Sequence, residues 1–209
     1  MVRTMKFRAI DLVLLVALIA GGSYYATHWM EVTGWPNAVW KGAGVALLSL
    51  WAFARGHPWI GLALAFGALG DVLLETSGLI VGAIAFLFGH VLASGFYWRS
   101  HRTGPAIPAL IAVAVALASY QLTGDRGVGL YAAFLGLMAG TAIVSRFRLA
   151  ALGATLFVIS DLLIFARLGP MAASPLPGLL IWPTYFAGQA LIAWGVVSEL
   201  AREDIHDRI

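Results

Sequence analysis

Long apolar runs dominate this chain of 209 residues and leave few folds open to it. A helix of 18 or more apolar residues is long enough to cross about 30 Å of hydrocarbon. Such runs can be drawn at residues 9–27, 36–54, 58–76, 78–98, 105–122, 127–145, 148–166 and 177–198. Only 11% of the residues are charged, against about 25% in a typical soluble domain. We therefore predict an all-α, polytopic membrane protein with eight transmembrane helices in one domain, residues 1–209.

The positive charges are spread unevenly over the predicted loops and ends. Eight spans would put both termini on one side, and that side would carry ten Lys or Arg residues against two, Arg126 and Arg167, on the other. The ten are Arg3, Lys6, Arg8, Arg55, Arg99, Arg102, Arg146, Arg148, Arg202 and Arg208. Cytoplasmic flanks carry such an excess, so we predict cytoplasmic termini in a bacterial-type inner membrane. The pI of about 9.5 follows from this bias and does not indicate a nucleic-acid partner.

Two aspartates lie deep inside predicted helices, in similar surroundings. Asp71 stands in Gly-Asp-Val-Leu-Leu, and Asp161 stands in Ser-Asp-Leu-Leu-Ile. An ionisable side chain at membrane depth costs roughly 2.5–3.5 kcal/mol on insertion scales, so it usually faces a partner, a polar cavity or a substrate. The pair therefore indicates a site with two acid/base groups.

The two halves of the chain resemble each other. A shift of 90 positions superimposes the aspartates, and a shift of 99 aligns the later part of each half, because a Pro-rich loop adds nine residues. The matched pairs are Asp71 with Asp161, Lys41 with Tyr131, and His90 with Gln189. We predict two parallel four-helix repeats, at about 9–98 and 105–198, with a central pocket between them that all six side chains line.

The residues alone leave several roles open for the aspartates. Two carboxyl groups in one low-dielectric cavity tend to ionise in separate steps, which provides a general acid beside a general base. Alternatively, each aspartate only neutralises Lys41 or accepts a hydrogen bond from Tyr131 and so holds helices together. Midplane carboxylates with a lysine are also typical of a proton-coupled transporter or carrier of a lipid or small amphiphile.

Other chemistries find less support. His90 with the two aspartates is a poor match for the three protein ligands of a catalytic zinc site, because the usual pair of histidines on one helix is missing. We therefore expect no metal and no other cofactor. The chain has no cysteine, and Ser160 cannot face its neighbour Asp161 on a helix, so nucleophilic catalysis is not indicated.

Several short motifs together resemble one family of membrane proteins. They are Lys41, Gly70-Asp71, Phe86-x-x-x-His90, Gly153-x-x-Leu156-Phe157-x-x-Ser160-Asp161 and Tyr185-x-x-x-Gln189. This set resembles the YhhN-like lysoplasmalogenase family over nearly the whole chain. Characterised members are eight-helix membrane proteins that hydrolyse the vinyl ether bond of lysoplasmalogens to a fatty aldehyde and a glycerophospho-headgroup.

The resemblance implies roles for individual residues. Asp71 and Asp161 would be the catalytic pair, and a lysophospholipid taken from the bilayer would be the substrate. The supporting or substrate-binding residues would be Lys41, His90, Tyr131, Ser160, Tyr185 and Gln189. Among these, Lys41 would bind the headgroup phosphate or influence a carboxyl group, and His90 would orient an aspartate or relay a proton.

Overall fold

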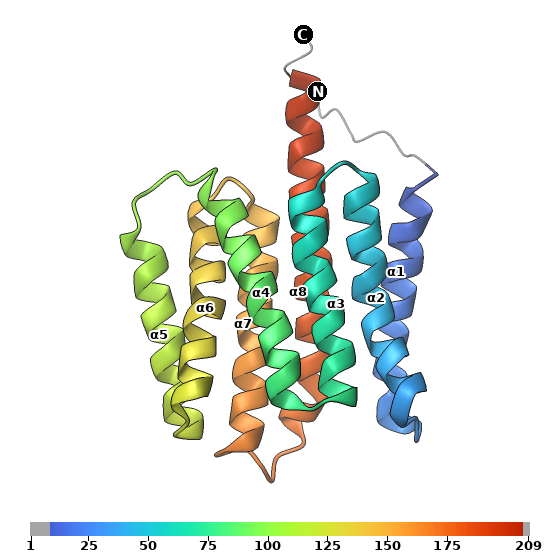
Figure 1. The fold of residues 1–209 in the computed structure, drawn as a ribbon, viewed down its shortest axis with the longest axis vertical. Helices are drawn as coiled ribbons and strands as arrows, with labels where there is room; N and C mark the ends of the chain where they lie inside the picture. Colours follow the sequence, from blue (N-terminus) through green and yellow to red (C-terminus); the bar gives the residue numbers. More distant parts are fainter. Residues whose placement is uncertain (1–8, 207–209) are drawn as a thin grey trace.

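The computed structural model describes residues 9–206, which form a bundle of α-helices running alternately in opposite directions (Figure 1). The helices are α1 (Asp11–Ser23), α2 (Gly34–Ala54), α3 (Pro58–Thr76), α4 (Leu79–Trp98), α5 (Ala106–Thr123), α6 (Arg126–Val144), α7 (Arg148–Leu168) and α8 (Leu176–His206). A 3-10 helix, η1 (Tyr24–Trp29), continues α1. No strand occurs among the described residues. The predicted all-α class is confirmed.

Helix ends follow ordinary capping chemistry. Pro58 opens α3, where its missing N–H costs nothing, and Gly124 ends α5 with a positive φ of 68°. Asp125 caps α6 by accepting the N–H groups of Gly127 and Val128 at 2.6 and 3.2 Å. These signals are local, so the predicted boundaries lie within a few residues of the observed ones for the internal helices.

The first and last helices differ from the predicted spans. The α-helical part of the first ends at Ser23, where Trp182 donates its Nε1–H to the carbonyl oxygen of Gly21 at 2.8 Å and the chain tightens into η1. The last helix continues to His206, well beyond the apolar run (Figure 1). An ion pair from Arg146 to Glu203 holds this extension against the α6–α7 connection.

Seven of the helical segments in residues 9–206 are long and apolar enough to cross a membrane. The exception is α2, which has 21 residues but carries Asn37 and Lys41 in its first half. The protein is therefore an integral membrane protein. The predicted count of eight spans depends on α2, whose polar residues belong to the site described below.

Helices that follow each other in the chain pack side by side, except α4 and α5, and α8 contacts α1, α2 and α3 of the first half. The first four helices meet the last four mainly through α2 with α8 and through α4 with α6. In the predicted repeat, α2 corresponds to α6 and α4 corresponds to α8. The contact between α2 and α8 would then be equivalent to the contact between α6 and α4. The repeat itself stays a prediction.

One end of the bundle is rich in arginine. We call it the basic end, where α1 begins and α8 ends (Figure 1). By the helix bounds, the arginines near this end are Arg55, Arg99, Arg102, Arg146, Arg148 and Arg202. Arg126 and Arg167 lie at the opposite end, as predicted. Arg3, Lys6, Arg8 and Arg208 lie outside the described residues. Which side of the membrane the basic end faces stays a prediction.

A buried ion pair locks α1 to α2 at the basic end. Arg55 pairs with Asp11, which also accepts a hydrogen bond from Trp51 Nε1 at 2.9 Å. Both charged side chains are only 5–6% exposed. The two opposite charges compensate each other in the apolar interior. Removal of one would leave the other buried without a partner and should destabilise the bundle.

We predict that Asp11→Asn lowers the free energy of unfolding by about 3–5 kcal/mol, because it leaves the charge of Arg55 buried without its carboxylate. The measurement is thermal or denaturant unfolding in detergent. Glu199→Gln is the matched control, since its pair with Arg202 is exposed and should be worth less than about 1 kcal/mol. Equal small losses in both variants would show that the buried pair is not important for stability.

Candidate functional site

Asp71 is held by a tyrosine of the last helix. The carboxyl group lies on α3 and is 1% exposed, and Tyr185 donates its hydroxyl to Oδ2 at 2.8 Å. Gln189, one turn further along α8, donates its Nε2–H to the oxygen of Tyr185 at 3.2 Å. The polar groups form a short chain from Asp71 through Tyr185 to Gln189. We call this chain the Asp71 unit.

Asp161 has a second unit of the same design. It lies on α7, is 5% exposed, and accepts the hydroxyl of Tyr131 from α6 at 2.8 Å. His90 of α4 places Nε2 at 3.1 Å from the same hydroxyl oxygen. When Tyr131 gives its proton to Asp161, its hydroxyl oxygen accepts a hydrogen bond from the Nε2–H tautomer of His90. We call this chain the Asp161 unit.

A cluster of aromatic rings joins the two units. Phe157, one turn before Asp161, lies with its centroid 5.0 Å from that of His90 and 5.1 Å from that of Tyr185. Phe86 packs edge-on against both Phe157 and Tyr185, at 5.8 Å from each. The two aspartates themselves lie within electrostatic range of each other. An apolar, aromatic wall therefore stands between the two carboxyl groups, and their action as a single site stays a prediction.

Two glycines make room for this arrangement on α3. A Cβ atom at Gly67 would lie 2.9 Å from Nε2 of Gln189, and one at Gly70 would lie 2.7 Å from the ring of Phe86. The Gly70-Asp71 pair therefore has a packing reason, because the glycine lets an aromatic ring approach beside the carboxyl group.

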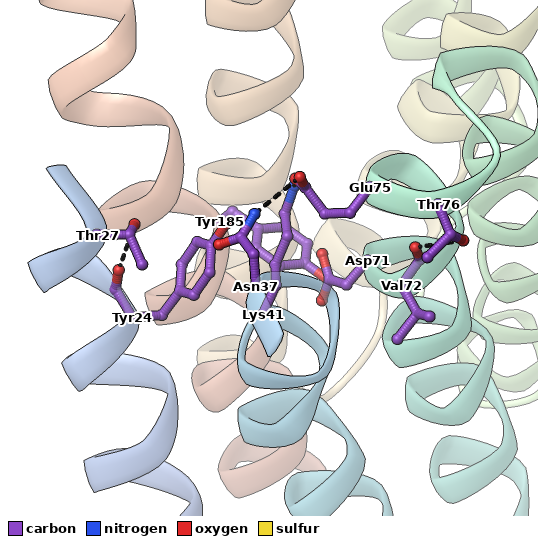
Figure 2. A network of polar contacts seen from close by, with 9 residues as sticks. All are labelled: Tyr24, Thr27, Asn37, Lys41, Asp71, Val72, Glu75, Thr76 and Tyr185. Atoms are coloured by element: carbon purple, nitrogen blue, oxygen red, sulfur yellow. Dashed lines mark hydrogen bonds and ion pairs between the residues drawn. The ribbon is translucent and has the colours of Figure 1, made fainter. Parts of the chain in front are cut away.

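Lys41 does not pair with either aspartate in this structure. Its Nζ lies 2.6 Å from Oε1 of Glu75, and Asn37 donates to Oε2 of the same carboxylate at 2.9 Å. Figure 2 shows both α2 side chains reaching Glu75, with Asp71 and Tyr185 beside them. Lys41 and Glu75 are partly exposed, at 16% and 29%, and both lie within electrostatic range of Asp71. The alternative in which Lys41 neutralises an aspartate is wrong as a direct contact, and the sequence did not single out Asn37.

Ser160 has a packing contact. Its hydroxyl donates to the carbonyl oxygen of Ile181 at 3.1 Å, which ties α7 to α8 next to Asp161. The side chain of Ser160 is buried, and this hydrogen bond between helices is a sufficient reason for a serine at this position.

A small cavity opens beside the aromatic cluster on the side toward the basic end. Its volume is about 20 Å³, which is enough for about one water molecule. Its lining is apolar except for His90 and Gln189, the outer members of the two units. Both units therefore reach a common space, although the cavity is far too small for a lipid chain.

The site has no obvious set of metal ligands. Within residues 9–206, no three His, Asp or Glu side chains lie close enough together to hold a metal ion. The acid and base groups of the site are instead paired with hydroxyl and amide groups.

Comparison with known proteins decides the family. The YhhN family model matches residues 37–196, which include every residue of both units. The chain belongs to the YhhN family. A search of the curated proteins found no match, and neither did a search of the solved structures. The resemblance noted in the motifs is thereby confirmed at the level of the family.

The structure also shows participants that the sequence did not reveal. Phe157 and Phe86 stand in the family-like motifs without an expected role, and in the structure they form the wall between the two units. Glu75 lies one turn after Asp71 on α3 and is the partner of Lys41. Because residues i and i+4 share a helix face, the spacing predicts that Glu75 lies beside Asp71, but it does not select between them as the partner of Lys41.

We predict that Gly70→Ala destabilises the protein by about 1–3 kcal/mol, because the new methyl group overlaps the ring of Phe86. Thermal unfolding in detergent measures the loss. Gly22→Ala is the control, since a Cβ there meets nothing within 4 Å, and alanine favours helix. If both substitutions leave stability unchanged, the close packing beside Asp71 is not needed.

Proposed function

We propose that this YhhN-family protein is a lysoplasmalogenase-like hydrolase that cleaves the vinyl ether bond of lysoplasmalogens. One observation carries the proposal: two buried aspartates, each bonded to a tyrosine hydroxyl, lie on either side of one aromatic cluster. Family membership supports the same reading. A structural role alone would not need both carboxyl groups within electrostatic range of each other.

The reaction requires acid and base groups but no nucleophilic side chain. A carboxylic acid protonates the alkenyl carbon β to the ether oxygen, and the electron pair of the double bond forms the new C–H bond. The resulting oxocarbenium ion is stabilised by the second carboxylate and captured by water, which loses a proton to that base. The hemiacetal then collapses to a fatty aldehyde and the glycerol hydroxyl group.

The tyrosines and their partners orient the two carboxyl groups for this reaction. Tyr131 and Tyr185 fix the orientation of Asp161 and Asp71, since each donates to only one carboxyl oxygen and leaves the other for substrate or water. His90 can pass a proton along the Asp161 unit, whereas the amide of Gln189 can only hold Tyr185 in place. Phe86 and Phe157 provide an apolar wall for the alkenyl chain and exclude bulk water.

We expect the purified protein to release aldehyde from a 1-alkenyl lysophospholipid and nothing from its 1-acyl and 1-alkyl counterparts. Asp71→Asn and Asp161→Asn should each lower the rate at least about 100-fold, because each removes one acid/base group. Asp125→Asn is the matched control, since asparagine also caps a helix and Asp125 lies on the loop before α6.

Three results would count against the proposal. Full turnover in either active-site variant would contradict the two-carboxyl mechanism. Fatty acid release from the acyl lipid would indicate ester hydrolysis. Saturable binding of the lysolipid with no bond cleavage, together with lipid movement across a vesicle membrane, would favour the transporter.

The contacts of Glu75 with Lys41 and Asn37 support a headgroup site beside Asp71. Glu75 lies one helical turn from Asp71, about 6 Å along α3. An extended glycerophospho group spans a similar distance, about 6 Å from phosphorus to ether oxygen over five bonds of about 1.5 Å. We propose that Lys41 and Asn37 donate to the phosphate while Glu75 accepts from a primary ammonium group.

This assignment predicts a preference for ethanolamine over choline lysoplasmalogens, because a quaternary ammonium group cannot donate a hydrogen bond to Glu75. In Glu75→Gln the ratio of the two kcat/KM values should fall by about tenfold, the value of one charged hydrogen bond of about 1.5 kcal/mol. Parallel assays of the two lipids measure the ratio, with Glu199→Gln as control. If Glu75→Gln leaves the ratio of the two kcat/KM values unchanged, the headgroup assignment is wrong, whereas the proposed reaction is not affected.

A further inference from the structure

A second and larger pocket lies at the basic end of the bundle, away from the two aspartate units. Its volume is about 510 Å³, within the range of small-molecule sites. The lining residues are Trp59, Phe96, Arg99, Ser100, His101, Arg102, Arg146, Phe147 and Glu203. They come from the start of α3, the end of α4, the α6–α7 connection and the extension of α8 (Figure 1). Both halves of the chain therefore build the pocket.

The pocket carries an excess of positive charge. Three arginines line it against one carboxylate, Glu203, which pairs with Arg146. Arg99 and Arg102 form no ion pair with any residue in the described part of the chain. In addition, Nε of Arg146 is buried and makes no hydrogen bond within residues 9–206. The donors open to an anionic partner are therefore those of Arg99 and Arg102, which are exposed and line the pocket.

The arginines are held in place by their surroundings. The guanidinium of Arg99 lies 4.4 Å from the ring centroid of Trp59, and that of Arg146 lies 5.0 Å from the ring of Phe147. The backbone N–H of Arg102 donates to the carbonyl oxygen of Val144 at 2.9 Å, which fixes the α4–α5 connection to the end of α6. Stacked guanidinium groups with fixed backbones lose little freedom when they bind a ligand.

We propose that this pocket binds a phosphate anion of the kind carried by an anionic phospholipid headgroup. Arginine recognises phosphate through paired N–H donors, and Arg99, Arg102 and Arg146 converge on one space. Basic pockets between helices near a membrane surface are suited to anionic headgroups. The aromatic side chains of Trp59 and Phe96 offer the apolar surface that the glycerol and upper acyl chain of a lipid would contact.

The pocket is separate from the proposed headgroup site of the substrate. Arg99 follows His90 by nine residues on α4, about 13 Å along the helix axis. The roughly 6 Å between phosphate and ether oxygen does not span that distance. A phosphate bound here would not present its own ether to the aspartates, and it would instead clamp the ends of α3 and α4 to the α6–α7 connection and α8.

Native mass spectrometry and thermal unfolding of the full-length protein in neutral detergent test the proposal. We expect dioleoyl phosphatidylglycerol to remain bound and to raise the unfolding temperature, whereas dioleoyl phosphatidylcholine should do neither. The double variant Arg99→Gln/Arg102→Gln should bind phosphatidylglycerol at least about tenfold more weakly. Arg148→Gln/Arg167→Gln is the control, because both arginines are exposed and neither lines the pocket.

Inorganic phosphate in a parallel titration distinguishes the source of the anion. Protection by phosphate at millimolar concentration without lipid would assign the pocket to a soluble phosphate compound, and protection by phosphatidylglycerol alone would assign it to the bilayer. If neither binds, or if both variants lose binding equally, the proposal is wrong. If the double variant does not fold, competition between phosphate and phosphatidylglycerol is measured on the unaltered protein. Displacement of one by the other supports a shared phosphate site, and binding without displacement contradicts it. Aldehyde release should stay within about twofold in both variants, since neither alters the aspartate units.

Discussion

The burial of two carboxyl groups inside an apolar helical bundle is the constraint on which the rest of this structure depends. Each group would be costly at membrane depth if it lacked a donor, and each receives a tyrosine hydroxyl at 2.8 Å. The donors come from different helices, so α3 must lie against α8 and α7 against α6. Close approach at Gly70 and the aromatic packing of Phe157 then follow from the same requirement.

The two halves meet this requirement in different ways, and the difference is chemically useful. The Asp71 unit takes both of its partners, Tyr185 and Gln189, from α8, whereas the Asp161 unit draws on α6 and α4. One unit ends in an amide and the other in an imidazole. Similar units with unlike outer groups suit the proposed reaction, in which one carboxyl group gives a proton and the other stabilises a cation.

Much of this was readable from the sequence, because it depends on local patterns. Apolar runs and caps predicted the helices, and the match between Asp71 and Asp161 predicted two carboxyl groups inside the bundle in similar surroundings. The partner of Lys41 was not readable, since Asp71 and Glu75 share a helix face and only side-chain packing selects between them. The bond from Tyr185 to Asp71 joins residues 114 positions apart, and no local pattern specifies such a contact.

The central claim is that the site protonates a vinyl carbon and adds water to the resulting cation, and isotope labelling tests it directly. In D₂O containing ¹⁸O, trapped aldehyde should carry one deuterium on the carbon next to the carbonyl group. The released glycerophospho-headgroup should contain no ¹⁸O, because the bond that breaks is between the ether oxygen and the alkenyl carbon. An aldehyde without carbon-bound deuterium, or a headgroup labelled with ¹⁸O, would contradict this account.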